Sequence, residues 1–259
     1  MVKAKESTKN IGLHVAVVTP TYNEIGNIEK LLTSLQRVSS EHTDDHFSVF
    51  VIDDSSPDGT ADLVKILKKK LRTKNFEITL ITRKEKDGLG RAYIFGFKKV
   101  LAHKPAFDYI LQMDADLSHN PAYVTSFLHQ AKQGADFIVA SRYTPGGGTP
   151  DWPWYRQLLS RGGNIYTRLL LGNRITDYTG GFNMYKASLM KTMNVDTIEA
   201  GGYGFLIDLK YRALKHAKNI AQIPIIFIDR QHGNSKIPKN TIIKNFILVP
   251  KIRYGKKEH

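Results

Sequence analysis

The stretch Tyr109-Ile-Leu-Gln-Met-Asp114-Ala-Asp116-Leu-Ser-His-Asn-Pro121 carries two aspartates at the end of an apolar run. In an extended strand, residues i and i+2 point to the same side, so Asp114 and Asp116 are expected to direct both carboxylates at one point. Two hard oxygen ligands suit Mg²⁺ or Mn²⁺, with water and substrate phosphates completing the coordination. Because Asp-x-Asp is a common pattern, a pair of solvated aspartates in a strand-to-helix turn is the alternative for this stretch alone.

Two earlier strand-to-helix joints also carry polar residues. The short β-rich run at residues 13–18 leads into Pro20-Thr-Tyr-Asn-Glu24, and the run at residues 47–52 leads into Asp53-Asp-Ser-Ser-Pro-Asp-Gly59. Open α/β sheets bind ligands at the carboxyl ends of their strands, so Tyr22, Glu24 and Asp54 are candidates for contact with a ligand. Asp58 is interpreted as a turn residue, and Thr60 is expected to cap the following helix.

The alternation of strands and helices continues to residue 142 and predicts a parallel, doubly wound α/β sheet. Further strands are expected at residues 76–81, 107–113 and 135–141. Gly88-Leu-Gly-Arg91 opens a helix whose amino end favours an anion, although a tight turn explains the two glycines equally well. A dinucleotide-binding unit is disfavoured because no G-x-G-x-x-G follows the first strand.

The regular alternation of predicted strands and helices ends after Arg142. A glycine-rich loop at residues 144–150 precedes an expected helix at 155–171, and residues 184–193 are also expected to be helical. A last β-rich run, residues 220–228, ends in Arg230-Gln-His-Gly-Asn-Ser235-Lys236. This loop is either a second anion clamp or a solvated turn.

Composition limits the class of protein. The chain has 259 residues, of which 41% are hydrophobic, enough for one large or two small domains. It has no cysteine, which excludes disulfides and thiolate metal sites and fits a reducing compartment.

Residues 1–12 are expected to be a loose tail without the apolar core of a signal peptide, and no apolar run approaches the ~20 residues of a membrane span. The net charge of +14 indicates an anionic partner, whether nucleic acid, phosphorylated substrate or acidic membrane.

Taken together, the motifs resemble those of inverting GT-A type nucleotide-sugar glycosyltransferases, and more closely those of the dolichol-phosphate (polyprenol-phosphate) mannose synthase family. The resemblance covers residues 15–236. It is carried by Pro20-Thr-Tyr-Asn-Glu24, Asp53-Asp-Ser-Ser-Pro-Asp-Gly59, Gly88-Leu-Gly90, Met113-Asp-Ala-Asp-Leu117, Ser141-Arg-Tyr143, Ser160-Arg-Gly162 and Arg230-x-x-Gly-x-Ser-Lys236, in this order.

The resemblance implies a GT-A fold, a Rossmann-like, mostly parallel sheet flanked by helices with a C-terminal acceptor-binding extension. One catalytic domain is expected at residues 13–236, with the nucleotide-sugar half at about 13–142 and the acceptor half at about 143–236. A basic amphipathic segment, residues 237–259, follows it.

Residue roles also follow from the resemblance. The nucleoside of GDP-mannose is expected to contact Pro20, Tyr22, Glu24, Ile52 and Asp54. Asp114, Ala115 and Asp116 are expected to frame the Mg²⁺ or Mn²⁺ ion and the diphosphate, with Ser118, where some relatives carry Gln, as the third protein ligand. Arg142, Arg230 and Lys236 are expected to bind phosphates of donor and acceptor, and catalysis is expected to depend on Asp116, Arg142 and Arg230.

The implied reaction transfers mannose from GDP-mannose to dolichyl (polyprenyl) phosphate with inversion, for protein glycosylation and GPI-anchor synthesis. A lipid phosphate has a second pKa of ~6, so at neutral pH it is already a nucleophilic dianion and no protein base is expected. The nearest alternative is a polyprenyl-phosphate glucosyltransferase that uses UDP-glucose. A non-catalytic scaffold is disfavoured because both metal aspartates are retained. A nucleic-acid partner is not expected either, because no helix shows a basic face interleaved with aromatic residues.

The presumed acceptor lies in a bilayer, so the protein is expected to bind the membrane surface as a peripheral protein. The segment Thr241–Pro250 places Ile242, Ile243, Phe246, Ile247 and Val249 on a short helix, which is expected to lie in the interface or to pack on the protein's own core. Relatives without a membrane domain depend on small membrane-embedded subunits, so such a partner is expected here. The expected location is the cytosolic face of the endoplasmic reticulum membrane, or the cytoplasmic membrane in a prokaryote.

Overall fold

A computed structural model of the chain describes residues 12–198, 201, 203–229 and 239–255. Its centre is a seven-stranded sheet in the order β3-β2-β1-β4-β6-β5-β7. Strand β6 runs antiparallel to its neighbours β4 and β5, and the other paired strands are parallel. The strands are β1 (His14–Thr21), β2 (His46–Asp53), β3 (Phe76–Thr82), β4 (Tyr109–Gln112), β5 (Phe137–Ser141), β6 (Asn183–Lys186) and β7 (Ile220–Pro224).

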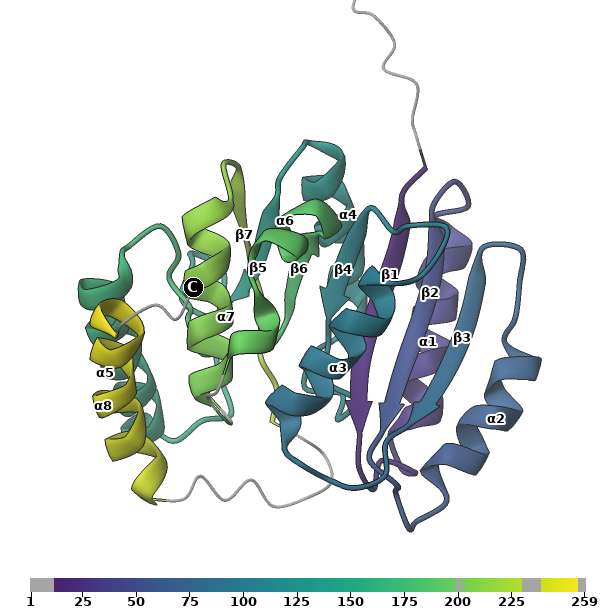
Figure 1. Cartoon of the computed structure of the whole chain (residues 1–259), viewed down its shortest axis with the longest axis horizontal. Coiled ribbons are helices and arrows are strands. Elements are labelled where there is room, and N and C mark those ends of the chain that lie inside the picture. Colours follow the sequence, from purple (N-terminus) through teal and green to yellow (C-terminus); the bar gives the residue numbers. More distant parts are fainter. Residues whose placement is uncertain (1–11, 199–200, 202, 230–238, 256–259) are drawn as a thin grey trace, which may run out of the picture.

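Helices cover both faces of this sheet (Figure 1). One buried core joins the sheet to α3, α6 and α7, and the other joins it to α1, α2 and α4. The helices are α1 (Ile28–Glu41), α2 (Thr60–Lys70), α3 (Leu89–Leu101), α4 (Val124–Lys132), α5 (Trp154–Leu171), α6 (Ala187–Thr192), α7 (Tyr203–His216) and α8 (Lys239–Tyr254), with short 3₁₀ turns at Pro121–Tyr123 and Val195–Thr197.

Strand β1 shows why this stretch of sequence forms a central strand. Val15 and Val17 pack into the core beneath α1, whereas Ala16 and Val18 pack into the core beneath α3, and all four are completely buried. Parallel strands that are covered on both faces read as continuous apolar runs, which is the pattern of residues 15–18. The predicted mostly parallel α/β sheet is therefore confirmed.

Two local predictions were wrong. Residues 183–186 form strand β6, inserted between β4 and β5, and only residues 187–192 are helical. Residues 183–186 lie between β4 and β5 and pair with both strands. This pairing satisfies the buried backbone groups of all three strands, which stabilises the strand more than the local sequence pattern stabilises a helix. Thr60 does not cap α2 but is its first residue, and the Asp58 carboxylate accepts its backbone N–H at 3.0 Å.

The fold gathers the loops that follow β1, β2 and β4 at one edge of the sheet, the lower edge in Figure 1, where the arrowheads of these strands lie. The second half of the sequence contributes β6 and β7 to the same sheet. Helices α5 and α8 pack against each other at the left end of Figure 1, and α8 also packs against α7.

Candidate functional site

A cleft of about 280 Å³ opens at the carboxyl edge of the sheet. It unites polar residues that are separated by as many as 96 positions in the sequence, as expected for strand ends that meet at one edge. Its lining residues are Pro20, Thr21, Tyr22, Glu24, Asp54, Lys86, Gly88, Leu89, Ala92, Asp114, Ala115 and Asp116. Seven of the residues predicted to bind the nucleotide sugar are among them: Pro20, Tyr22, Glu24, Asp54, Asp114, Ala115 and Asp116.

A second cleft, of about 220 Å³, lies at the opposite edge, where His14 and His46 begin β1 and β2. In parallel sheets ligands bind outside the carboxyl ends of the strands. The first cleft is therefore the candidate site, because it has that position and also contains the clustered carboxylates.

The end of β2 supplies Asp54 to the cleft. Its side chain is 6% exposed, and Arg83 Nε lies 3.3 Å from its Oδ1. Burial raises the pKa of Asp54, and the nearby Arg83 guanidinium opposes that shift. Neither Asp54 Oδ1 nor Arg83 Nη1 has a hydrogen-bond partner among the described residues. Asp54 lines the cleft, so its unsatisfied oxygen is a candidate acceptor for a donor group on a ligand.

Tyr22 forms part of the cleft wall. It is 37% exposed, and the Lys86 ammonium lies 3.9 Å from its ring centroid. Behind it, Asp53 accepts hydrogen bonds from Thr21 Oγ1 at 2.9 Å and from Ser56 Oγ at 2.6 Å. These bonds tie the end of β1 to the loop after β2 and so fix the shape of this wall.

Asp114 and Asp116 lie in the loop after β4, because the strand ends at Gln112. The prediction that they are alternate residues of a strand was therefore wrong in its geometry, although both line the same cleft. The backbone turns here: Leu117 has φ 64°, and Asp116 Oδ1 accepts the Ser118 backbone N–H at 3.0 Å. Short local bonds of this kind are typical of Asp in turns, and they hold the carboxylate beside the cleft.

The two carboxylates suit a divalent cation only with ligands from elsewhere. Among the described residues, no group of three or more His, Cys, Asp or Glu side chains is placed to hold a metal ion. Mg²⁺ is commonly held by one or two carboxylates together with substrate phosphates and water. Asp114 and Asp116 fit that donor set, since both border a cleft large enough to admit a diphosphate.

Ser118 and Ile52 do not line this cleft. The Ser118 hydroxyl donates to Asp116 Oδ1 at 2.6 Å, so it orients that carboxylate. Ile52 is completely buried, and its side chain packs against Gly96 of α3. Arg230 and Lys236, the predicted phosphate clamp, lie outside the described residues.

Arg142, predicted to bind phosphate, is held in a buried ion pair at the end of β5. Its Nε and Nη2 donate to the two carboxylate oxygens of Asp177 at 2.7 and 2.8 Å, and Nη2 also donates to Thr179 Oγ1 at 2.8 Å. Burial alone would raise the pKa of Asp177, but the Arg142 guanidinium holds it well below its usual range. The sequence interpretation gave Asp177 no role beyond a loop.

A second buried cation lies behind this pair. The Lys210 ammonium on α7 donates to the Asp177 backbone carbonyl at 2.6 Å, and the residue is completely buried. Burial lowers the pKa of Lys210 to about 7, although the nearby Asp177 opposes the shift. Sequence reasoning missed Lys210 because a lysine on a helix is ordinarily assigned to the solvent.

The loop at residues 177–181 joins the Arg142 pair to the carboxylate cleft. A side chain at Gly180 would meet the Asp177 carboxylate at 3.3 Å, and one at Gly181 would meet Asp114 Oδ2 at 3.4 Å. The Phe227 ring, which lies 5.6 Å from the Arg142 guanidinium, also contacts the His119 ring next to Asp114. The Arg142 guanidinium and the Asp114 and Asp116 carboxylates are therefore neighbours. The guanidinium can attract one anionic group, and the carboxylates can hold a second one through a divalent cation.

No helix in the described part of the chain is long and apolar enough to cross a membrane.

Known proteins resemble this chain in sequence and in fold. It is 36% identical to the undecaprenyl-phosphate mannosyltransferase of Micrococcus luteus over 225 residues, covering 87% of this chain and 88% of that protein. It is 34% identical to the polyprenol monophosphomannose synthase of Mycolicibacterium smegmatis over 226 residues, covering 87% and 82%.

In structure, the chain is similar to the glucosyl-3-phosphoglycerate synthase of Mycobacterium tuberculosis. The complex of that enzyme with Mn²⁺, UDP and glucosyl-3-phosphoglycerate matches with a TM-score of 0.63 at 18% identity, over 95% of this chain and 82% of that one. Its complex with Mg²⁺ and UDP matches with a TM-score of 0.64 at 18% identity, with the same coverage. These matches support the GT-A fold. The model of Glycosyl transferase family 2 matches residues 16–193, and with the two sequence relatives it establishes that this chain is a glycosyltransferase of that family.

Proposed function

We propose that this enzyme transfers mannose from GDP-mannose to the phosphate of a polyprenyl lipid, with inversion at the anomeric carbon. Two relatives at 34–36% identity are named for mannosyl transfer to polyprenyl phosphate, which supports the sugar and the acceptor. The GDP-mannose donor and the roles in protein glycosylation and GPI-anchor synthesis come from the sequence resemblance and stay predictions.

The observation that carries the proposal is that the Asp114 and Asp116 carboxylates lie close to a buried cluster that contains the cations Arg142 and Lys210. Asp114 and Asp116 border the cleft that also contains Tyr22 and Asp54, and Gly181 connects them to the Arg142–Asp177 pair. Donor and acceptor of this reaction both carry phosphate. A site for it needs one region that suits a metal-bound diphosphate and another that attracts a phosphate dianion.

In this proposal, Pro20, Tyr22, Glu24 and Asp54 hold the nucleoside, and Asp114 and Asp116 hold the diphosphate through a divalent cation. When bound, that cation would supply positive charge to the leaving diphosphate as a Lewis acid. Arg142 directs the acceptor phosphate, with Arg230 and Lys236 as further phosphate ligands. No side chain needs to remove a proton, because the acceptor is a dianion above its second pKa of ~6.

The exposed apolar surface of α5 supports attachment to a membrane. The helix displays six large hydrophobic side chains that are 55–80% exposed: Trp154, Tyr155, Leu158, Leu159, Ile165 and Leu169. Soluble monomers rarely expose contiguous apolar patches of this kind without a partner. A helix with such a face can lie in the lipid headgroup region, near the acceptor.

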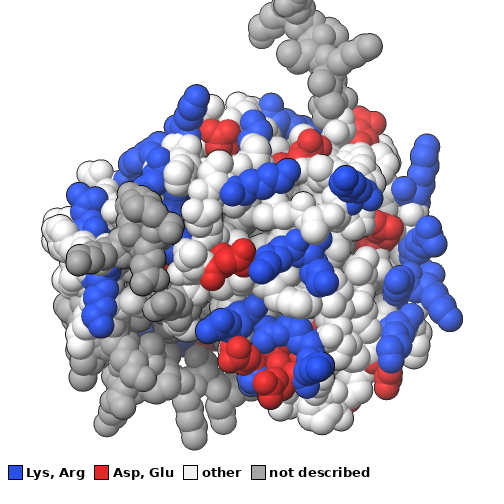
Figure 2. All heavy atoms as spheres, in the orientation of Figure 1, with Lys and Arg blue, Asp and Glu red and all other residues white. Residues whose placement is uncertain are grey.

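Helix α8, the segment predicted to contact the membrane, packs beside α5. Its Val249 is buried in the protein core and its Ile247 is 56% exposed, while the side chains of residues 239–246 lie outside the described part. We therefore propose that α5 carries most of the membrane contact and that α8 supports it. Lys68, Lys69 and Lys70 lie in the last turn of α2, which is at the end of the molecule opposite to α5 in Figure 1. Figure 2 shows Lys and Arg side chains gathered along the right side of the molecule.

Both sequence relatives come from bacteria, which favours the cytoplasmic face of a cytoplasmic membrane over the endoplasmic reticulum. Small membrane-embedded partner subunits stay part of the proposal, as a second means of attachment.

The direct test is transfer assayed with the purified full chain. GDP-mannose and UDP-glucose are each offered with undecaprenyl phosphate, with Mn²⁺, with Mg²⁺ and with excess EDTA. We expect β-mannosyl phosphate from GDP-mannose only, and background rates in EDTA. Glucosyl transfer from UDP-glucose at the higher rate would replace the proposed donor, and full activity in EDTA would remove the metal from the proposal.

A further inference from the structure

Two buried side chains hold Asp114 from outside the cleft. The Tyr93 hydroxyl of α3 donates to Asp114 Oδ1 at 2.6 Å, and the Asp114 backbone N–H donates to His119 Nδ1 at 2.9 Å. Tyr93 is completely buried, His119 is 3% exposed, and neither is among the residues that line the cleft. Tyr93 therefore binds the carboxylate of Asp114, and His119 binds the backbone N–H of the same residue.

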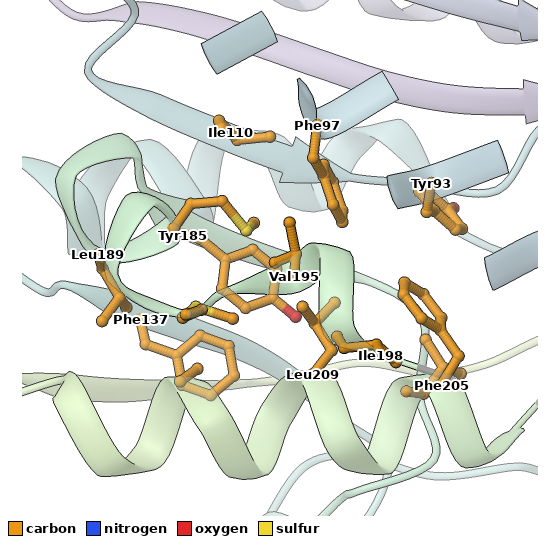
Figure 3. Close-up of a cluster of buried hydrophobic side chains, with 14 of the residues drawn as sticks. Tyr93, Phe97, Ile110, Phe137, Tyr185, Leu189, Val195, Ile198, Phe205 and Leu209 are labelled. Atoms are coloured by element: carbon orange, nitrogen blue, oxygen red, sulfur yellow. The ribbon is translucent and has the colours of Figure 1, made fainter. Parts of the chain in front are cut away.

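The Tyr93 ring is fixed by aromatic neighbours. Its centroid lies 5.9 Å from that of Phe205 on α7, with the rings only 8° from parallel, and 5.7 Å from that of Phe97 (Figure 3). Gly90 lets Phe205 approach, because a side chain there would come within 2.9 Å of the Phe205 ring. The bond to Asp114 requires the phenol to act as the donor, because an ionised carboxylate can only accept.

The His119 ring is equally confined. It stacks on Phe182, with centroids 4.9 Å apart and an angle of 12° between the rings, and a side chain at Gly181 would approach its Cε1 to 3.2 Å. Since Nδ1 accepts a backbone N–H, the ring hydrogen is on Nε2. That atom lies 3.9 Å from Asp114 Oδ2, beyond hydrogen-bond range, so the main-chain bond is the contact His119 makes with Asp114 in this geometry.

We infer that Tyr93 and His119 are positioning residues that hold the Asp114 carboxylate in its binding orientation before the nucleotide sugar arrives. The inference rests on the proposed role of Asp114 as a ligand of the metal–diphosphate group. A carboxylate on a loop can otherwise rotate, and ordering it would subtract from the affinity for the donor. Asp116 differs, because its orientation comes from the adjacent Ser118 on the same loop.

The test of Tyr93 is the variant Tyr93→Phe, which keeps the ring and removes the hydroxyl. Its matched control is Tyr185→Phe, which removes a buried hydroxyl that donates to Gln112 Oε1 in the same core. Binding of GDP with MnCl₂, in the absence of acceptor, is measured by calorimetry, and thermal unfolding is recorded for both variants.

We expect Tyr93→Phe to bind Mn²⁺–GDP about tenfold more weakly, the lower end for loss of a group that orients a metal ligand. The control is expected to bind like the wild type, with a similar change in melting temperature. Equal affinities in the two variants would overturn the role of Tyr93. If the wild type itself bound no Mn²⁺–GDP, the proposed function would fail instead, so the two failures are distinguishable.

His119 is tested with a pair of isosteres. In His119→Asn the amide oxygen occupies the place of Nδ1 and can still accept the Asp114 N–H, whereas in His119→Gln the polar group occupies the place of Nε2. We expect His119→Asn to bind Mn²⁺–GDP with an affinity within about threefold of the wild type, and His119→Gln to bind it about tenfold more weakly. Greater loss in Asn than in Gln, or full affinity in both, would overturn the assignment.

Discussion

The donor half and the acceptor half of the proposed site are held together by different kinds of interaction. In the donor half, turn residues bond to neighbours two positions away, as in Asp58 with Thr60 and Asp116 with Ser118, and Tyr93 of α3 adds a more distant bond to Asp114. In the acceptor half, Arg142 is oriented by Asp177, 35 positions away, and Asp177 is in turn bound by Lys210, 33 positions further on. The donor half thus combines local turns at strand ends with a few hydrogen bonds from uncharged groups elsewhere, and the acceptor half is a buried cluster of charges.

This difference bears on stability as well as on binding. Turn residues at a cleft edge can change at a smaller cost to the core, because the bonds they lose are local and do not leave an unpaired buried charge. Breaking a buried ion pair by removing one partner leaves the other charge without compensation and costs roughly 3–5 kcal/mol. Substitutions in the donor half should therefore affect activity, whereas those in the acceptor half should affect activity and stability together.

The largest effect is expected for Asp116→Ala in the donor half. Transfer should fall by at least about three orders of magnitude, because the leaving diphosphate loses a charge-stabilising ligand. The melting temperature should stay within a few degrees of the wild type, since the lost bonds to Ser118 are local. Asp62→Ala, at an exposed acid on α2, is the control and should be fully active. Near-normal turnover of the Asp116 variant would remove this residue from the site.

Arg142→Lys tests the acceptor half. Lysine keeps the charge but cannot reproduce the two-pronged contact with Asp177, so we expect about a hundredfold loss in kcat/KM for the polyprenyl phosphate. Urea unfolding should show a loss of about 2–3 kcal/mol in the same variant. If Arg142→Lys lost activity but kept its free energy of unfolding, the expectation that substitutions in the acceptor half lower activity and stability together would be wrong.

Arg230→Ala extends this test to a residue outside the described part of the chain. It should reduce transfer by roughly two orders of magnitude, the scale for one preorganised donor. Lys256→Ala and Lys257→Ala should each have much smaller effects. Equal, mild losses at all three positions would mean that these basic residues only attract the membrane.

Lys210→Met gives a pH-dependent test of the buried cluster. The pKa of Lys210 is about 7 in the folded protein, well below the ordinary lysine value of 10.5, so between these pH values the unfolded chain binds the extra proton. Stability of the wild type should therefore rise with pH from about 7 toward 10 by a few kcal/mol relative to the variant. Below pH 7 the difference should be constant, because Lys210 is then protonated in both the folded and the unfolded chain. Chemical denaturation at pH 6, 7.5 and 9 measures it, and a pH-independent difference would contradict the assignment.

The smallest effect is expected at the membrane surface. The isolated chain should float weakly with acidic liposomes and be released at 1 M salt, where the Debye length is ~3 Å. Leu169→Glu on α5 should reduce the bound fraction several-fold, because the side chain is 80% exposed on the apolar face. Ile66→Glu on α2, at a side chain that is 62% exposed, is the matched control and should bind like the wild type. Salt-resistant insertion of the wild-type chain would overturn this interpretation.

Much of the donor half was predictable from the sequence because its information is local. Apolar runs at residues 15–18 and 47–52, each followed by a polar turn, indicated strands whose carboxyl ends meet. Their lengths and order therefore predict that Tyr22, Asp54 and Asp114 lie at one edge of the sheet. The resemblance to a family added the metal, the donor and the acceptor as expectations.

The sequence by itself determined the α/β class, the strand ends that form the cleft and the acids that line it, because hydrophobic periodicity and turn residues act over a few neighbours. Only the tertiary structure decided that residues 183–186 become a strand, that Tyr93 reaches Asp114, and that Arg142, Asp177 and Lys210 share one buried cluster. Each of these depends on partners more than 20 positions away. A buried polar group is satisfied by whichever partner the packed chain brings to it, and spacing along the sequence does not encode that partner.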